Sequence, residues 1–341
     1  MSCDADRELK TSRDNRAAAD ARSVKRVEIA FLFPGQGAQR VGMGAALARE
    51  FEPAHRVFEE ADAALGFALS RLCFEGPEEE LRLTANTQPA TLATSIAAFR
   101  AFEAECGLAA ELAAGHSLGE YSALVAAGAI AFGDALKAVR ERGRLMQEAC
   151  PPGQGTMAAL LGLDRAAVDA LCAEVTTATE LAVPANLNAP GQVVISGHAA
   201  AVRRALELAK SRGGGASMEL KVSAPFHCPL MRPARDGMIP VLEELTIKPL
   251  RFGVIANATA EVNRDPERVK SLLLEQITSP VRWEESMAIL AGAGIAEMIE
   301  FGEGRVLAGL MRRINRDIKV RTTEDPKALR GTIAALSATT A

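Results

Sequence analysis

The stretch Ala114-Gly115-His116-Ser117-Leu118-Gly119-Glu120 decides the fold of this chain. It has the pattern Gly-x-Ser-x-Gly, in which a serine stands at the tip of a sharp turn between a strand and a helix. Glycines two residues before and after the serine allow the crowded backbone of such a turn. Small apolar residues precede it, and residues 121–127 form an alanine-rich run compatible with a helix. The pattern predicts a nucleophilic Ser117, although an ordinary strand–helix turn also fits the five residues taken alone.

Composition restricts the class of protein. The chain has 341 residues, of which 48% are hydrophobic and 24% charged, and its net charge is −4. This length suits two lobes, because one domain usually takes roughly 100–200 residues. A weakly acidic chain lacks the basic footprint of a protein that binds nucleic acid or an anionic membrane. We therefore expect a protein or small-molecule partner, with no nucleic acid and no membrane.

Six cysteines are scattered along the chain, without a C-x-x-C pair or a cluster of cysteine and histidine at metal-ligand spacing. They are Cys3, Cys73, Cys106, Cys150, Cys172 and Cys228. We expect neither a disulfide framework nor a metal site. No apolar run reaches the ~18 residues of a membrane span, and the polar start of the chain lacks the apolar core of a secretory signal. These features predict a cytoplasmic protein.

Predicted strands and helices alternate on both sides of a central segment. Residues 27–33 form an apolar run rich in β-formers that ends at Pro34-Gly35, and helical patterns follow, with a break expected before Pro89. The alternation predicts an α/β lobe over residues 27–150 and 223–325, with a parallel sheet flanked by helices. Residues 1–26 are too polar to bury much surface and are expected to be a disordered or loosely helical tail. Residues 326–341 are expected to be a C-terminal tail.

The central segment, residues 151–222, starts at the chain-breaking run Pro151-Pro152-Gly153 and has a different pattern. It predicts strands at 156–163, 182–188, 192–196 and 217–222, with helices at 165–175 and 199–211. The order strand-helix-strand-strand-helix-strand is typical of a small ferredoxin-like α+β subdomain.

Pro34-Gly35-Gln36-Gly37-Ala38-Gln39 follows the first predicted strand. The loop lacks the third glycine of a dinucleotide-binding G-x-G-x-x-G, which disfavours NAD. Its backbone N–H groups could instead point into a cleft and stabilise an oxyanion.

Two further side chains are candidates for the same site. Arg142 lies on a predicted helix that offers no acid at i±3 or i±4, so it is either a solvated or distantly paired arginine or one that awaits a carboxylate ligand. His227 lies between Pro225 and Pro229, in a constrained loop, where it is either structural or the base that an elbow serine needs.

Taken together, these motifs resemble those of the malonyl-CoA:acyl carrier protein transacylases of fatty acid synthesis and of the acyltransferase domains of polyketide synthases. The resemblance runs from Val27 to about Val320. The matching stretches are Phe33-Pro34-Gly35-Gln36-Gly37, Gly115-His116-Ser117-Leu118-Gly119-Glu120-Tyr121-Ser122, Arg142-Gly143, Met146-Gln147, Asn188-Ala189-Pro190-Gly191-Gln192-Val193-Val194-Ile195-Ser196-Gly197, Pro225-Phe226-His227-Cys228, Ser279-Pro280-Val281-Arg282-Trp283 and Gly302-Glu303-Gly304.

The resemblance implies a hydrolase-like α/β lobe that carries the ferredoxin-like insert. It also implies roles for single residues. Ser117 would be the acylated nucleophile and His227 the general base, oriented by the backbone carbonyl of Gln276. The backbone N–H groups of Gln36 and Leu118 would form the oxyanion hole, and Arg142 would hold the malonyl carboxylate. His116, Phe226 and Asn188 would line the site.

The implied substrates are malonyl-CoA, a coenzyme A thioester, and an acyl carrier protein whose phosphopantetheine thiol accepts the malonyl group. No cofactor would be bound permanently, and we expect a monomer. Leu118 and Phe226 resemble the pattern found with malonyl rather than methylmalonyl substrates. Cys228, beside the base, raises the possibility of a second nucleophile, although it lies on no elbow.

Alternative functions use the same chemistry. The chain could be a stand-alone acyltransferase of a polyketide synthase, which sequence does not separate from a fatty acid enzyme. An ester or acyl-carrier hydrolase would need an acid between the serine and the histidine. Asp164 is a candidate for that acid, but the insert carries it away from the site. A non-catalytic carrier-binding module would not need serine, histidine and arginine together.

Overall fold

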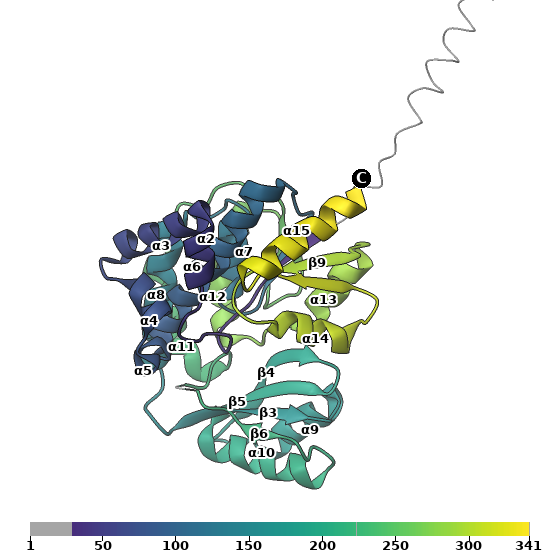
Figure 1. Cartoon of the computed structure of the whole chain (residues 1–341). Helices are drawn as coiled ribbons and strands as arrows, with labels where there is room; N and C mark the ends of the chain where they lie inside the picture. The colour runs from purple at the N-terminus through teal and green to yellow at the C-terminus, as the bar shows by residue number, and fades with distance from the viewer. Residues whose placement is uncertain (1–28, 223, 341) are drawn as a thin grey trace, which may run out of the picture.

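Two lobes, each built around one sheet, make up the described part of the chain (Figure 1). The computed structural model describes residues 29–222 and 224–340. The tail predicted for residues 1–26 lies outside these ranges, as do residues 27 and 28 of the first predicted strand. None of the helices within these ranges is long and apolar enough to cross a membrane.

The large lobe contains a sheet of strand order β10-β9-β1-β2-β7-β8. All neighbouring strands in it are parallel except the pair β7 and β8, which confirms the predicted parallel sheet flanked by helices. The elements of this lobe are β1 (Ile29–Phe33), α2 (Ala45–Glu50), α3 (Glu52–Leu65), α4 (Leu69–Glu75), α5 (Glu78–Leu81), α6 (Thr84–Cys106), β2 (Leu112–Gly115), α7 (Gly119–Ala126), α8 (Phe132–Glu148), η1 (Pro229–Met231), α11 (Arg232–Glu243), β7 (Gly253–Ile255), β8 (Val262–Asn263), α12 (Pro266–Thr278), α13 (Trp283–Gly292), β9 (Glu297–Glu300), α14 (Val306–Ile314), β10 (Lys319–Thr322) and α15 (Pro326–Thr340).

Strand β1 lies inside this sheet and is buried on both faces. Successive side chains of a strand point to opposite faces. Phe31 and Phe33 accordingly pack into the cluster formed with α3 and α6, whereas Ala30 and Leu32 pack into the cluster formed with α13 and α14. The Phe31 ring makes edge-on contacts with four other phenylalanine rings, at centroid distances from 5.1 to 6.0 Å. This packing holds the carboxyl end of β1, where the glycine-rich loop begins.

The small lobe is the antiparallel sheet predicted for the central segment, with strand order β4-β5-β3-β6. This arrangement is that of a ferredoxin-like fold. Helices α9 and α10 pack on the sheet around an apolar cluster of their own. The elements are β3 (Gly155–Leu161), α9 (Arg165–Val175), β4 (Ala182–Ala189), β5 (Gln192–His198), α10 (Ala199–Ser211) and β6 (Met218–Glu219).

Backbone hydrogen bonds join the two lobes. Val281 of the large lobe donates its N–H to Ala185 O at 2.8 Å and accepts from Leu187 N at 2.9 Å, so it pairs with β4 of the small lobe. The two lobes are thus connected by sheet-type pairing in addition to the covalent chain. The domain limits at residues 150/151 and 222/223 stay a prediction, since residue 223 lies outside the described ranges.

Two expectations about the helices differ from the structure. Residues 326–340 are not a tail: they form α15, which packs against α2, α6 and β10 and places Leu329 and Leu336 in the main core (Figure 1). The break expected before Pro89 is also wrong, because α6 continues through that residue. A proline removes one backbone donor, and here the tertiary packing of a largely buried helix outweighs that loss.

We predict that Leu329→Ala lowers the free energy of unfolding by about 2–5 kcal/mol, the usual cost of removing a fully buried leucine side chain. Urea unfolding followed by circular dichroism measures the change. Lys327→Ala, an exposed position on the same helix, is the matched control and should change the free energy by less than about 0.5 kcal/mol. Equal effects of the two substitutions would contradict the docking of α15.

Candidate active site

The elbow places Ser117 between β2 and α7 with a backbone φ of 53°, in the left-handed region that non-glycine residues rarely adopt. The flanking glycines make this possible. A Cβ on Gly115 would lie 1.8 Å from Gly119 O, and a Cβ on Gly119 would lie 2.1 Å from Phe33 O. Only glycine fits at either position, so the predicted strand–turn–helix geometry is present.

Asn257, which the sequence did not single out, holds the elbow from the end of β7. Its Oδ1 accepts from Ser117 N at 2.6 Å, and its Nδ2 donates to Gly115 O at 2.7 Å. The side chain is buried and both of its polar ends are used. Asn257 therefore stabilises the strained turn from a strand that lies far from it in the sequence.

His227 lies beside the serine, as expected for a base. Its Nε2 is 2.7 Å from Ser117 Oγ, and its Nδ1 is 2.9 Å from Gln276 O. Because a carbonyl oxygen can only accept, Nδ1 carries the ring proton and Nε2 is left as the acceptor for the serine hydroxyl. Burial, together with the charge of Arg142, lowers the pKa of His227 to about 3, which keeps the ring neutral.

Arg142 has no exposed surface, which excludes the solvated alternative. Its Nη1 donates to Gln88 Oε1 at 2.7 Å, and its Nη2 donates to Gln276 Oε1 at 2.8 Å and to Ser117 Oγ at 3.2 Å. Its Nε is buried without a hydrogen-bond partner. The guanidinium thus meets the serine and two neutral amide oxygens, and within the described ranges no carboxylate forms an ion pair with it.

The two amides expected to form an oxyanion hole belong to the segments that follow β1 and β2. Leu118 N stands at the start of α7, and Gln36 N belongs to the loop after β1. In the part of the chain that the structure describes, neither amide has a hydrogen-bond acceptor. The loop is tied down on its far side, where Arg40 Nε donates to Glu303 Oε1 at 2.7 Å. An unpaired N–H at this position is available for a developing negative charge.

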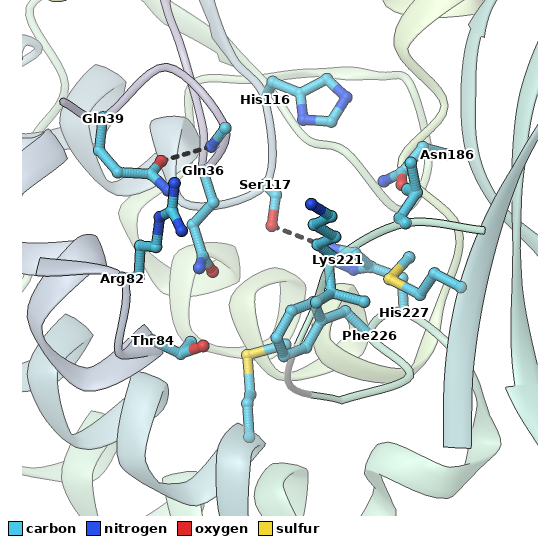
Figure 2. Close-up of a pocket in the computed structure, with 15 residues that line it drawn as sticks. Gln36, Gln39, Arg82, Thr84, His116, Ser117, Asn186, Lys221, Phe226 and His227 are labelled. Atoms are coloured by element: carbon cyan, nitrogen blue, oxygen red, sulfur yellow. Dashed lines mark hydrogen bonds between the residues drawn. The ribbon is translucent and has the colours of Figure 1, made fainter. Parts of the chain in front are cut away.

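A cavity of about 430 Å³ opens over these groups, between the two lobes (Figure 2). Ser117, His227, His116 and Phe226 line it, and so do the side chains of Arg82 and Lys221. Arg142 is not among the lining residues. Asn188 does not line the cavity. Its Oδ1 lies 2.8 Å from His116 Nε2, so it orients that ring instead, and Asn186 of the same strand lines the cavity.

His116 is also held by Trp283, whose ring centroid lies 5.4 Å away. Burial lowers the pKa of His116, so this ring too is neutral. On the opposite side of the elbow, the ring of Tyr121 lies under the guanidinium of Arg142, with 5.7 Å between the ring centroid and the carbon of the guanidinium. The chain contains one tryptophan and one tyrosine, and both contact the site.

Two other candidates are not part of this chemistry. Cys228 is fully buried, its Sγ donates to Pro225 O at 3.1 Å, and burial raises the pKa of its thiol to about 11. A thiol held neutral in this way is a poor nucleophile. Asp164 accepts from Ala167 N at 2.8 Å and caps α9 in the small lobe. Within the described ranges, no group of His, Cys, Asp and Glu side chains could hold a metal ion.

Sequence reasoning missed Gln88, Glu120 and Asn257 as parts of the site. Each is a buried polar residue whose partner lies far away in the chain: Gln88 bonds Arg142, Glu120 bonds Gln276, and Asn257 bonds the elbow. Glu120 was visible only as the last residue of the elbow motif. No local pattern distinguishes the other two from ordinary polar residues.

The geometry is that of an acyl-transferring serine enzyme, and comparison with known proteins agrees. Residues 30–312 match the family described as acyl transferase domain, and the chain belongs to this family. Malonyl CoA-acyl carrier protein transacylase of Bacillus subtilis is 49% identical over 302 residues, which cover 89% of this chain and 95% of that protein. The enzyme of the same name from Escherichia coli K12 is 42% identical, over 89% of this chain and 97% of that protein.

Solved structures give the same result. The malonyl CoA-acyl carrier protein transacylase of Coxiella burnetii superimposes with a TM-score of 0.90 at 39% identity, covering 92% of this chain and 99% of that one. A malonyl-transacylase solved in complex with the acyl-carrier protein of a type II polyketide synthase has a TM-score of 0.88 at 42% identity, covering 90% of this chain and 99% of that one.

The neutral state of His227 predicts a pH effect on stability. Between about pH 6.5 and pH 3 the unfolded ring binds a proton that the folded ring refuses, so the free energy of unfolding falls as the pH falls through this window. His227→Gln removes this contribution and should make the decline shallower in urea unfolding measured from about pH 7 to pH 4. Glu120 and Glu300, whose pKa values burial raises to about 7, remain in both proteins and cancel in the comparison.

The control is Leu329→Ala, which destabilises the protein but removes no titratable group. This substitution should lower the free energy of unfolding by the same amount at every pH. Parallel curves for the unmodified chain and His227→Gln would show that the ring is not held neutral by its surroundings.

Proposed function

We propose that this chain transfers a malonyl group from malonyl-CoA, through an ester on Ser117, to the phosphopantetheine thiol of an acyl carrier protein. The observation that carries the proposal is the meeting of three groups at one oxygen atom: a serine at an elbow, a neutral histidine 2.7 Å from its hydroxyl, and a buried arginine behind the cavity wall, 3.2 Å from the same oxygen. The family membership and the named relatives support the same reaction.

In the first half-reaction Ser117 Oγ attacks the thioester carbonyl while His227 Nε2 takes the hydroxyl proton. The carbonyl oxygen becomes an oxyanion, which accepts hydrogen bonds from Gln36 N and Leu118 N. Collapse of this intermediate breaks the carbon–sulfur bond. The leaving thiolate takes the proton from His227, which releases coenzyme A and leaves malonyl-Ser117. Gln276 O keeps the ring oriented throughout, so a dyad performs the work of a triad.

In the second half-reaction the thiol of the carrier protein gives its proton to His227 and attacks the ester carbonyl. The same oxyanion contacts form, and Ser117 regains its proton from His227 when the ester bond breaks. Arg82 and Lys221 are exposed and line the cavity (Figure 2). Arg82 pairs with Glu78 at 2.6 Å, so Lys221 is the side chain that supplies positive charge for the phosphate of either thiol carrier. No permanently bound cofactor takes part in this scheme.

Arg142 would select the acyl group by binding the free carboxylate of malonyl. Its guanidinium is desolvated and forms no direct ion pair with a carboxylate within the described ranges, so a substrate carboxylate would meet N–H groups that are bonded only to neutral oxygens. A charge-assisted contact of this kind contributes about 1.5–3 kcal/mol. Malonyl would then be favoured over acetyl by about ten- to a hundredfold.

The biological setting is a proposal of the same kind. Supply of malonyl units for fatty acid synthesis agrees with the two bacterial relatives, whereas the transacylase solved with a polyketide carrier protein keeps that pathway as the second candidate. The free cysteines at 73, 106, 150, 172 and 228 agree with a reducing cytoplasm. A monomer remains our expectation.

The test of the transfer reaction is intact-mass analysis after mixing with malonyl-CoA. We expect a stable malonyl adduct that disappears when a holo carrier protein is added, and no adduct on Ser117→Ala. An adduct that survives in Ser117→Ala would exclude the proposed nucleophile. An adduct that decays in water before any thiol is added would favour the hydrolase instead.

Arg142→Lys keeps the positive charge but loses the planar fork. We expect kcat/KM for malonyl-CoA to fall by about ten- to a hundredfold, while kcat/KM for acetyl-CoA does not fall in parallel. Arg144→Lys is the control: Arg144 lies on the same helix, but it is exposed and pairs with Glu141 and Glu148. A proportional loss with both acyl groups would contradict a carboxylate-binding role for Arg142.

A further inference from the structure

A buried carboxylate lies directly behind the site. Glu120 follows the elbow on α7 and is 3% exposed. Its Oε2 accepts from Asn257 N at 3.0 Å and from Gln276 Nε2 at 2.8 Å. Glu120 takes no part in the proposed transfer reaction. Burying a carboxyl group costs free energy, so its presence here needs a reason.

Gln276 connects Glu120 to Arg142. Its amide nitrogen donates to Glu120 and to Ser117 O, the latter at 2.9 Å, which leaves its Oε1 to accept from Arg142 at 2.8 Å. The side-chain amide of Gln276 therefore lies between Glu120 and Arg142, and the two charged groups do not form a direct ion pair. Glu120 can offset the charge of the guanidinium at short range without occupying any of its N–H groups.

Glu120 is the group of this cluster whose charge can change near neutral pH. Within the described ranges, the charged or titratable side chains that interact with it are Arg142 of α8 and Tyr121 of α7. The neutral Gln276 of α12 and the backbone N–H of Asn257 after β7 donate hydrogen bonds to it. The rings of His116 and His227 belong to the same site, and burial lowers the pKa of both, so they stay neutral. Burial raises the pKa of Tyr121 to about 12, so its hydroxyl stays neutral. Burial also raises the pKa of Glu120 to about 7, against the hydrogen bonds from Asn257 and Gln276 and the charge of Arg142.

We propose that Glu120 is the resident counter-anion of Arg142, and that it takes up one proton from solvent when a substrate carboxylate binds the same guanidinium. The inference rests on the proposed malonyl transfer. Two carboxylates that share one buried cation repel each other, so the arrival of the second favours protonation of the first. Glu120 is in this sense a positioning residue, because it acts on the substrate through Gln276 and Arg142.

Selectivity then depends on pH in a defined direction. Malonyl binds more tightly when Glu120 is protonated, so its binding weakens as the pH rises through the range where Glu120 ionises. Acetyl carries no carboxylate and makes no such demand. Any effect of His227 on the chemical step acts on both acyl groups equally, so the ratio of kcat/KM for malonyl-CoA to that for acetyl-CoA isolates Glu120.

The experiment measures this ratio for acylation of Ser117 between about pH 6 and pH 8.5. In the unmodified chain it should fall by roughly tenfold, the factor that corresponds to one pKa unit of coupling. Glu120→Gln, which has the same shape and no charge, should hold the ratio at its low-pH value throughout. Glu141→Gln is the matched control and should keep the normal fall, because Glu141 lies next to Arg142 in sequence but pairs with Arg144.

A second measurement uses only the unmodified chain, so it tests the proposal even if Glu120→Gln does not fold. The unmodified chain is mixed near pH 7 with malonyl-CoA or with acetyl-CoA in weak buffer containing a pH indicator dye. We expect proton uptake that accompanies the malonyl adduct and is absent with acetyl. A normal malonyl adduct without proton uptake, or a pH-independent ratio, overturns the role of Glu120 alone. Failure of both esters to form an adduct overturns the proposed function itself.

Discussion

A positive charge with no exposed surface lies at the centre of the site, and the structure around Arg142 is arranged to keep it there. Amide oxygens reach it from two helices, Gln88 from α6 and Gln276 from α12. Buried polar groups are stable only when they are hydrogen-bonded, so both helices must keep their position and rotation relative to α8. The continuation of α6 through Pro89, one residue after Gln88, belongs to the same arrangement.

Gln276 extends this constraint to the rest of the site. Its side chain contacts Arg142, Glu120 and the backbone of Ser117, while its own carbonyl orients His227. Asn257 acts similarly on the elbow from the end of β7. The nucleophile, the base and the anion-binding group are thus linked through two neutral amides. A displacement of one group is transmitted to the others. This coupling explains how the serine and the histidine keep their relative positions without an acidic third residue.

Local patterns predicted the parts of the protein that depend on nearby residues. The glycines around Ser117 predicted the turn, and the order of short periodic segments predicted both sheets. The site residues that sequence missed depend on long-range contacts: Asn257 bonds a turn 140 residues away, and Gln88 bonds an arginine 54 residues away. The docking of α15 belongs to the same class, because its apolar residues are few and their partners lie on α2 and α6. Asn188, expected to line the site, instead bonds His116, and Asn186 of the same strand lines the cavity, a distinction that depends on long-range contacts too.

The aromatic residues of the site have an optical consequence. Trp283 is the one tryptophan in the sequence and lies against His116, and Tyr121 is the one tyrosine and lies against Arg142. Both rings are fully buried. Indole emission from this chain therefore originates at one position, beside His116, and the tyrosine band of the near-ultraviolet dichroism originates at one position, beside Arg142. Signals that in most proteins average over many surroundings here each report on a single neighbour of the catalytic serine, without any attached label.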